Sequence, residues 1–215
     1  MLPDAFTAIL LGALLGLRHA TDADHVVAVT AIVARERSLK RAAWVGALWG
    51  IGHTLTLVLV GGAIVAFRLV IPPRLGLGLE FGVALMLILL GFNSLRRRAG
   101  ETSVASVRVR PLLVGLVHGL AGSAAVALLV LATVRGTLEA LAYLVVFGLG
   151  TIAGMVAVTV ILAAPTLYAG HKVARFQTGI RFAAGALSIA FGLLLARELI
   201  VDGGLFSATP TWEPH

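Results

Sequence analysis

One short stretch concentrates ionisable side chains inside an otherwise apolar part of the chain. The sequence "RHATDADH" (18–25) holds one arginine, two histidines and two aspartates, with apolar runs before and after it. Imidazole nitrogens together with carboxylate oxygens suit borderline divalent cations such as Ni²⁺, Co²⁺ and Zn²⁺. The chain has no cysteine, so thiolate metal sites and disulfides are excluded. The stretch therefore predicts a divalent-metal site with nitrogen and oxygen ligands.

The spacing of these residues suggests how they would share a site. On a regular helix, His19, Asp22 and His25 fall within an arc of about 120° and can face one ion. Arg18 can reach Asp22, one helical turn later, as an ion pair. Asp24 points about 100° away from His25. Asp24 therefore either orients a histidine from behind or joins the site because the helix unwinds there. The alternative is a buried Arg–Asp–His network that only locks helices together.

Two further histidines lie in later apolar runs. His53 stands in "WGIGHTLTLVLVGG" (49–62) and is a candidate third imidazole, with Thr54 beside it as a supporting oxygen ligand or cross-helix hydrogen bonder. His118 stands in "GLVHGLAGSAA" (115–125), whose small residues are typical of tight helix–helix contacts, and is a candidate ligand or gate. A packing role is the alternative for both histidines. We assign no role to His171 or His215.

The composition decides the class of protein that must position these residues. The chain has 215 residues, of which 59% are hydrophobic and 13% are charged, and its mean hydropathy is +1.01. Soluble domains are about half apolar and about a quarter charged. A charged side chain at the centre of a membrane helix costs about 2.5–3.5 kcal/mol, so intramembrane ionisable residues face the protein interior and indicate function. We therefore expect an all-α integral membrane protein with a functional site inside it.

Six apolar blocks predict six transmembrane helices, at 5–33, 42–67, 76–95, 111–134, 138–163 and 178–200. Pro111 is expected in the first turn of its helix, and Pro72, Pro73 and Pro165 are expected at helix exits. Glu80 stands toward the end of its block and is expected at the membrane interface. Neither an HExxH nor a Walker motif is present, so neither an intramembrane zinc protease nor an ATPase is indicated.

The basic residues predict the orientation in the membrane. Twelve lysines and arginines lie in or beside the loops that follow the first, third and fifth spans, and four lie on the opposite side. By the positive-inside rule, loops 1, 3 and 5 are cytoplasmic and both termini lie outside. This topology explains the net charge of +7 without a nucleic-acid partner. We expect a multi-pass protein of the cell (inner) membrane, in contact with the lipid bilayer, and the sequence leaves a homo-oligomer open.

The two halves of the chain can be aligned. "GLRHATDADHVVA" (16–28) matches "GLVHGLAGSAAVA" (115–127) at an offset of 99 and places His19 over His118. "GIGHT" (50–54) matches "GLGTI" (148–152) at an offset of 98. Three spans per half predict a 3+3 inverted repeat, which is typical of secondary transporters. The single transmembrane domain (1–215) then comprises half-repeats 1–95 and 111–200, a cytoplasmic linker 96–110 and a tail 201–215.

The segment "RHATDADH" (18–25) resembles the signature of the nickel/cobalt transporter family, NiCoT and its wider NicO group of LysE-like 3+3 span transporters. "GHT" (52–54) is similar to the Gly-His-Ser/Thr of the next helix in that family. The resemblance implies transport of Ni²⁺ or Co²⁺ for metalloenzymes such as urease and hydrogenase, with His19, Asp24 and His25 recognising the metal. The best-known members carry the signature in the second of eight spans, whereas here it falls in the first of six. Their later acidic motif has no counterpart here, which indicates a short, divergent member.

We therefore expect a secondary transporter, an uptake permease for Ni²⁺ and/or Co²⁺, with no cofactor and no enzymatic activity. The expected metal ligands are His19, Asp22, Asp24, His25, His53 and His118, with Arg18 and Thr54 in support. The alternatives are metal efflux, export of another small solute by the same 3+3 span group, or a metal-binding membrane accessory protein for urease or hydrogenase maturation. A purely structural membrane subunit is a further alternative.

Overall fold

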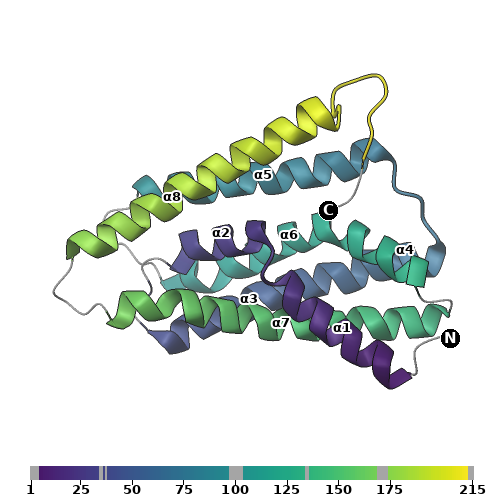
Figure 1. The fold of residues 1–215 in the computed structure, drawn as a ribbon, viewed down its shortest axis with the longest axis horizontal. Coiled ribbons are helices and arrows are strands. Elements are labelled where there is room, and N and C mark those ends of the chain that lie inside the picture. The colour runs from purple at the N-terminus through teal and green to yellow at the C-terminus, as the bar shows by residue number, and fades with distance from the viewer. Residues whose placement is uncertain are drawn as a thin grey trace.

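The computed structural model describes residues 5–33, 36, 38–96, 104–133, 136–168 and 174–212, and every regular element in these ranges is a helix (Figure 1). Two of the elements, η1 and η2, are single wider turns of π-helix that continue α-helices. The elements are α1 (Ala5–His19), α2 (Ala23–Val33), α3 (Leu39–Thr56), η1 (Leu57–Gly61), α4 (Gly62–Phe67), α5 (Pro73–Arg96), α6 (Val104–Thr133), α7 (Thr137–Tyr168), α8 (Ala174–Arg197) and η2 (Glu198–Asp202).

The first apolar block, 5–33, folds as two helices, so the helix is broken within the motif, which is one of the two alternatives considered for Asp24. The backbone N–H groups of Thr21 and Asp22 donate to the carbonyls of Arg18 and His19, three residues back, at 2.8 and 3.1 Å. The Thr21 hydroxyl also donates to the Arg18 carbonyl, at 2.6 Å. These tight local bonds end α1, because they replace the wider bonds of an α-helix. The α-helical pattern resumes with the four-residue hydrogen bond from the Val26 N–H to the Asp22 carbonyl, which begins α2.

Two groups of helices build the molecule. In one group, α3 packs along both α6 and α7, and α1 packs along α7. In the other, α5 and α8 pair with each other and lie to one side in Figure 1. The short helix α2 touches α5, α7 and α8. The helix that carries the second half of the His/Asp motif therefore lies between the two groups.

Glycines allow α1 and α6 to approach their neighbours closely. A Cβ added to Gly16 of α1 would lie 2.9 Å from the backbone nitrogen of Thr151 in α7, and one added to Gly115 of α6 would lie 2.9 Å from that of His53 in α3. Side-chain atoms do not fit at such distances, so these crossings depend on glycine. Gly115 and Thr151 follow Gly16 and His53 by 99 and 98 residues. The same contact thus occurs twice, with the two halves of the chain in exchanged roles.

The exterior is that of a membrane protein. Within the described chain, four helical segments are long and apolar enough to cross a membrane: Leu39–Phe67, Pro73–Arg96, Thr137–Pro165 and Thr178–Asp202. Large apolar side chains such as Leu138 and Phe67 are 81% and 75% exposed, as expected where lipid replaces water. The remaining blocks form shorter apolar helices, at Ile9–His19, Ala23–Val33 and Val109–Gly122. The total of six spans stays a prediction.

The expectations for Pro111, Pro165 and Pro73 are wrong, and Pro73, which was expected at a helix exit, instead begins a helix. Pro111 lies inside α6, which begins at Val104, and Pro165 lies inside α7, which continues to Tyr168. Residues 104–110, assigned to the linker, are therefore helical. A membrane helix tolerates an internal proline, because neighbouring groups can satisfy the single carbonyl that it frees. Pro73 is the first residue of α5, where the missing N–H leaves no hydrogen bond unmade.

Candidate metal centre

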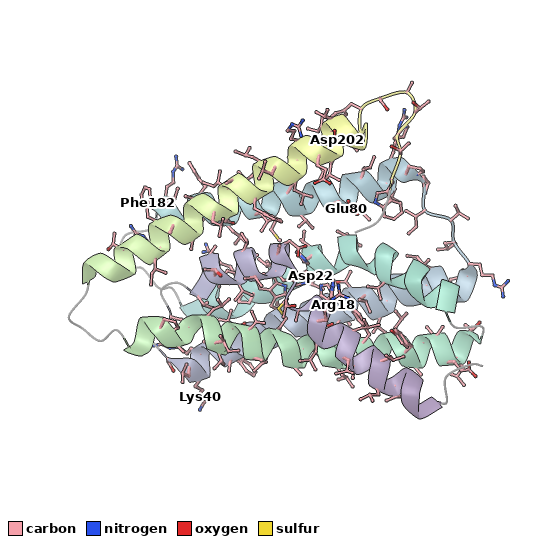
Figure 2. All side chains as sticks on the ribbon, viewed as in Figure 1. Arg18, Asp22, Lys40, Glu80, Phe182 and Asp202 are labelled. Atoms are coloured by element: carbon pink, nitrogen blue, oxygen red, sulfur yellow. The ribbon has the colours of Figure 1, made fainter. Side chains whose placement is uncertain are left out.

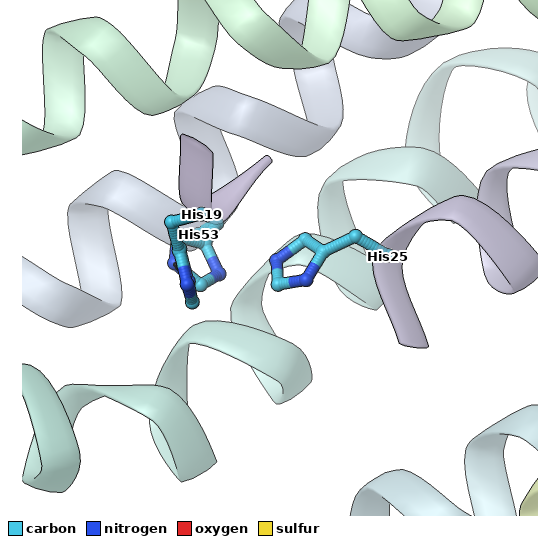
Figure 3. Close-up of side chains that lie close together, drawn as sticks. All are labelled: His19, His25 and His53. Atoms are coloured by element: carbon cyan, nitrogen blue, oxygen red, sulfur yellow. Dashed lines mark hydrogen bonds between the residues drawn. The ribbon is translucent and has the colours of Figure 1, made fainter. Parts of the chain in front are cut away.

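The break after α1 gathers the motif histidines with two others. His19 ends α1 and His25 lies in the first turn of α2, while His53 and His118 come from α3 and α6. The ring centroid of His25 lies 4.6 Å from that of His19, 5.3 Å from that of His53 and 4.0 Å from that of His118. Figure 3 shows the His25 ring pointing toward His19 and His53, which overlap in this view. Residues up to 99 positions apart therefore form one cluster.

In both motif histidines, the same ring nitrogen, Nδ1, lies within hydrogen-bond distance of an aspartate carboxylate. His19 Nδ1 lies 2.8 Å from Asp22 Oδ2, and His25 Nδ1 lies 3.0 Å from Asp24 Oδ1. An ionised carboxylate can only accept, so both Nδ1 atoms carry the hydrogen and both Nε2 atoms present a lone pair. A carboxylate behind the imidazole is the usual arrangement for histidines that bind a metal.

The free nitrogens of these imidazoles converge with a third. His19 Nε2 lies 3.2 Å from His53 Nε2. Metal–nitrogen bonds of about 2.0–2.1 Å place two ligand nitrogens about 2.9–3.4 Å apart, for bond angles between a right angle and the tetrahedral angle. One nitrogen from each of His19, His25 and His53 lies within 4.8 Å of the other two. We call these residues the three-imidazole set, and its geometry suits one divalent ion.

The three-imidazole set is largely hidden from solvent. His25 is 1% exposed and His53 is fully buried. Within the described chain, His25 Nε2 and His53 Nδ1 are buried and have no hydrogen-bond partner. A buried polar atom without a partner costs about 1–3 kcal/mol. Coordination of an ion by His25 Nε2 would remove that cost at one of these atoms.

Asp24 connects the motif to α6. Its Oδ1 also accepts the backbone N–H of His25, at 2.8 Å, and its Oδ2 lies 3.0 Å from His118 Nε2. Asp24, His25 and His118 offer three ligand atoms within 4.8 Å of one another. We call this second group the carboxylate set. The two sets share His25.

A cavity of about 730 Å³ opens beside the two sets, between the two groups of helices. Its wall from α1, α2 and α6 includes residues of the motif, and its opposite wall comes from α5, α8 and η2. Figure 2 shows Arg18 and Asp22 near the junction of α1 and α2, and Glu80 on α5. Four carboxylates against one guanidinium favour the approach of a cation. The charged side chains and histidines of the lining are Arg18, His19, Asp22, Asp24, Glu80, His118 and Glu198.

The expected ligands come together, but not on one helical face. Both arrangements considered for Asp24 occur in the structure, because the helix unwinds before this residue and its carboxylate stands behind His25. Asp22 contacts His19 from the side away from His53. The expected Arg18–Asp22 ion pair is absent from the described chain, because the Asp22 carboxylate pairs with His19 and Arg18 lines the cavity.

Thr54 makes a contact between helices. Its hydroxyl donates to the Gly148 carbonyl of α7, at 3.0 Å. The cross-helix alternative for this residue is therefore the one that the geometry favours. His171 and His215 lie outside the described residues.

Sequence reasoning missed two carboxylates of the cavity. Glu80 was expected at the interface, but it lines the cavity and accepts a hydrogen bond from the Trp212 indole, at 2.9 Å. Glu198 lies on the same side, at the start of η2. The chain has only ten acidic residues, so each one inside or beside an apolar block is a signal that could have been used.

A comparison with known proteins gives the family. The chain is 33% identical over 220 residues to the urease accessory protein UreH of Bacillus sp. (strain TB-90), and the match covers 94% of this chain and 96% of the relative. The chain belongs to the family of this urease accessory protein. No family model matches the chain, and no solved structure matches it. The match covers nearly the whole of both chains, so membership applies to the entire membrane domain.

Proposed function

We propose that this protein is a secondary transporter that carries Ni²⁺ or Co²⁺ across the cell membrane through the three-imidazole set. The observation that carries the proposal is the pair of Nε2 atoms of His19 and His53, 3.2 Å apart, beside the buried and unpartnered Nε2 of His25. Imidazole suits nickel, cobalt and zinc, whereas magnesium and calcium prefer oxygen ligands. Ionisable groups within membrane helices are functional by default.

The family supports a role connected with nickel. Its member UreH is named as a urease accessory protein. The signature resemblance at residues 18–25 implies the supply of nickel or cobalt to metalloenzymes, urease among them. The donor chemistry of the site, the resemblance and the relative's name thus agree on nickel as the first ion to test.

We also propose that the two halves form a 3+3 inverted repeat. Thr54 of α3 donates to the Gly148 carbonyl of α7, and a Cβ at Gly50 would lie 2.8 Å from Ile152 Cα. Gly148 and Ile152 follow Gly50 and Thr54 by 98 residues, so exchange of the halves converts one contact into the other. These contacts, and the reciprocal glycine contacts of α1 and α6, support a two-fold axis through the crossing of α3 and α7. Rocking of such halves would expose the site to either side in turn.

The orientation follows from the positive-inside rule. In Figure 1, α5 and α7 end toward the same end of the molecule, where Lys40 lies in Figure 2, and Asp202 lies toward the other end. The basic loops 1, 3 and 5 would then be cytoplasmic, with both termini outside. Uptake is the direction that we propose, with efflux as the alternative.

The test is metal flux through the purified protein in liposomes that contain a fluorescent metal indicator. We expect the wild-type protein to admit Ni²⁺ and Co²⁺ without any partner and His25→Ala to abolish the flux. His171→Ala, a histidine in neither ligand set, serves as the matched control. Vesicles of opposite orientation distinguish uptake from efflux.

The relative's name favours a second candidate, a metal-binding accessory protein that hands nickel to urease maturation and does not transport it. The same experiment separates the two functions. A wild-type protein that binds nickel but admits none into liposomes would support the accessory role. A wild-type protein that binds neither nickel nor cobalt would refute both and leave a structural subunit.

A further inference from the structure

The carboxylate set and the three-imidazole set differ in how they meet the cavity. Asp24 and His118 are part of the cavity wall. Of the three-imidazole set, His19 also lines this wall and its side chain is 18% exposed, whereas His25 and His53 are only 1% and 0% exposed. An ion that arrives through the cavity therefore meets Asp24, His118 and His19 before it can reach His25 Nε2 or His53.

The carboxylate set has the chemistry of a cation site. Asp24 Oδ2 lies 3.0 Å from His118 Nε2, and the other oxygen of the same carboxylate lies 3.0 Å from His25 Nδ1. One carboxylate and two imidazoles form a common donor set for divalent transition metals. His118 is 3% exposed, and within the described chain its Nδ1 is buried without a partner. That nitrogen can take the hydrogen that Nε2 gives up when a metal ion replaces the bond to Asp24. The unpartnered Nε2 of His25 can likewise take the hydrogen of His25 Nδ1 while Nδ1 binds the ion, and the hydrogen returns to Nδ1 when the ion moves to Nε2.

We propose that Asp24, His25 and His118 form a loading position, which takes the ion from the cavity and passes it around the His25 ring to the three-imidazole set. This inference rests on the proposed function and adds a second ion position to it. The carboxylate attracts the hydrated cation, while three imidazoles hold a borderline ion more selectively. The shared His25 and the repulsion between two divalent charges allow one ion at a time.

Gly122 stands beside the three-imidazole set, on the helix that also carries His118. It lines the cavity one turn after His118 on α6. A Cβ at this residue would lie 3.7 Å from His53 Cε1 and 3.9 Å from His19 Nε2. Glycine thus leaves open the space beside the three-imidazole set, and a larger side chain would fill it.

The experiment separates the rate of metal binding from its equilibrium. The ring of Trp49 lies 6.2 Å from that of His25 and 6.1 Å from that of His118, so bound Ni²⁺ or Co²⁺ should quench its fluorescence. Stopped-flow mixing of the full chain in micelles with Ni²⁺ gives the association rate, and dialysis with ⁶³Ni gives the stoichiometry and the Kd. Trp49→Phe identifies the signal.

We expect His118→Gln, whose amide can still donate to Asp24, to keep one Ni²⁺ per chain with a Kd within about three-fold of wild type. Its association rate and its liposome flux should each fall at least ten-fold. His118→Glu restores a metal ligand and should recover most of the rate. Gly122→Val should also slow association at least ten-fold, while Gly82→Val, at a glycine with nothing within 4 Å, should not.

Three results would overturn the loading position. They are an unchanged association rate in His118→Gln, an unchanged rate in Gly122→Val, and a 100-fold loss of equilibrium affinity in His118→Gln. The last would make His118 a ligand of a single site. Failure of the proposed function has a different signature, because the wild-type protein would then admit no metal into liposomes. Stopped-flow binding would still decide the loading position in that case.

Discussion

Substitutions of Asp22 test whether a carboxylate beside His19 raises the affinity of the site for metal. Its Oδ2 accepts from His19 Nδ1 at 2.8 Å, and the opposite nitrogen of that ring faces His53. Asp22→Asn keeps an oxygen that can accept the same hydrogen bond, but it removes the negative charge. Asp22→Ala removes the acceptor as well. The pair of variants therefore separates the charge behind His19 from the hydrogen bond that orients it.

The size of the effect follows from the exposure of the carboxylate. Removal of a group that orients a metal ligand typically costs 10–100-fold in metal affinity. The Asp22 side chain is 50% exposed, so water screens its charge and can partly replace its hydrogen bond. We expect Asp22→Asn to raise the Kd for Ni²⁺ about ten-fold, or about 1.4 kcal/mol, and Asp22→Ala to add about two- to three-fold more.

The assay is equilibrium dialysis of the purified protein in detergent micelles with ⁶³Ni at constant pH. Asp202→Asn is the matched control, because Asp202 is 59% exposed and its carboxylate lies 3.7 Å from Arg197, away from the cavity lining. A wild-type Kd in both Asp22→Asn and Asp22→Ala would refute the idea that a carboxylate tunes His19. A loss of more than 1,000-fold in Asp22→Asn would refute it in the other direction, because Asp22 would then bind the ion itself.

Three further outcomes are expected. Gly115→Ala should destabilise the fold by about 1–3 kcal/mol and weaken Ni²⁺ binding, because its Cβ would push against His53 N at 2.9 Å, whereas Gly78→Ala should change neither thermal unfolding nor affinity. Acidification should weaken Ni²⁺ binding, because protons compete with the metal for the imidazole lone pairs, and an affinity that stays unchanged down to strongly acid pH would contradict histidine ligands. Thr54→Val should lower the stability by about 0.6–1.7 kcal/mol through the lost bond to Gly148, with an unchanged Kd. A ten-fold change in that Kd would make Thr54 a ligand.

Several features could be predicted because they depend on hydropathy and local chemistry. The apolar block 76–95 corresponds to α5, Pro73–Arg96, within three residues at each end. The cost of charges in lipid predicted that the motif would face the interior, and the structure places it between the helix groups. The start of α6 was missed, because polar residues 104–110 continue a helix beyond its apolar part.

The arrangement of the site depended on contacts that no local pattern encodes. A regular helix through 18–25 places Arg18 beside Asp22. Because the chain turns at Thr21, the Asp22 carboxylate pairs with His19 instead. His118 had no acidic neighbour in its own span, and its partner Asp24 comes from the other half of the chain.

By itself, the sequence determined the class of this protein, the donors available to a metal and the stretch that carries them. Residue type alone sets which segments leave water and which atoms can bind nickel. Only the tertiary structure decided which nitrogen of each histidine is free, which carboxylate stands behind it, and that His118 and the cavity lie beside His25. These outcomes depend on where α1 breaks and how closely glycines let α3 and α6 approach, and both are properties of the packed bundle.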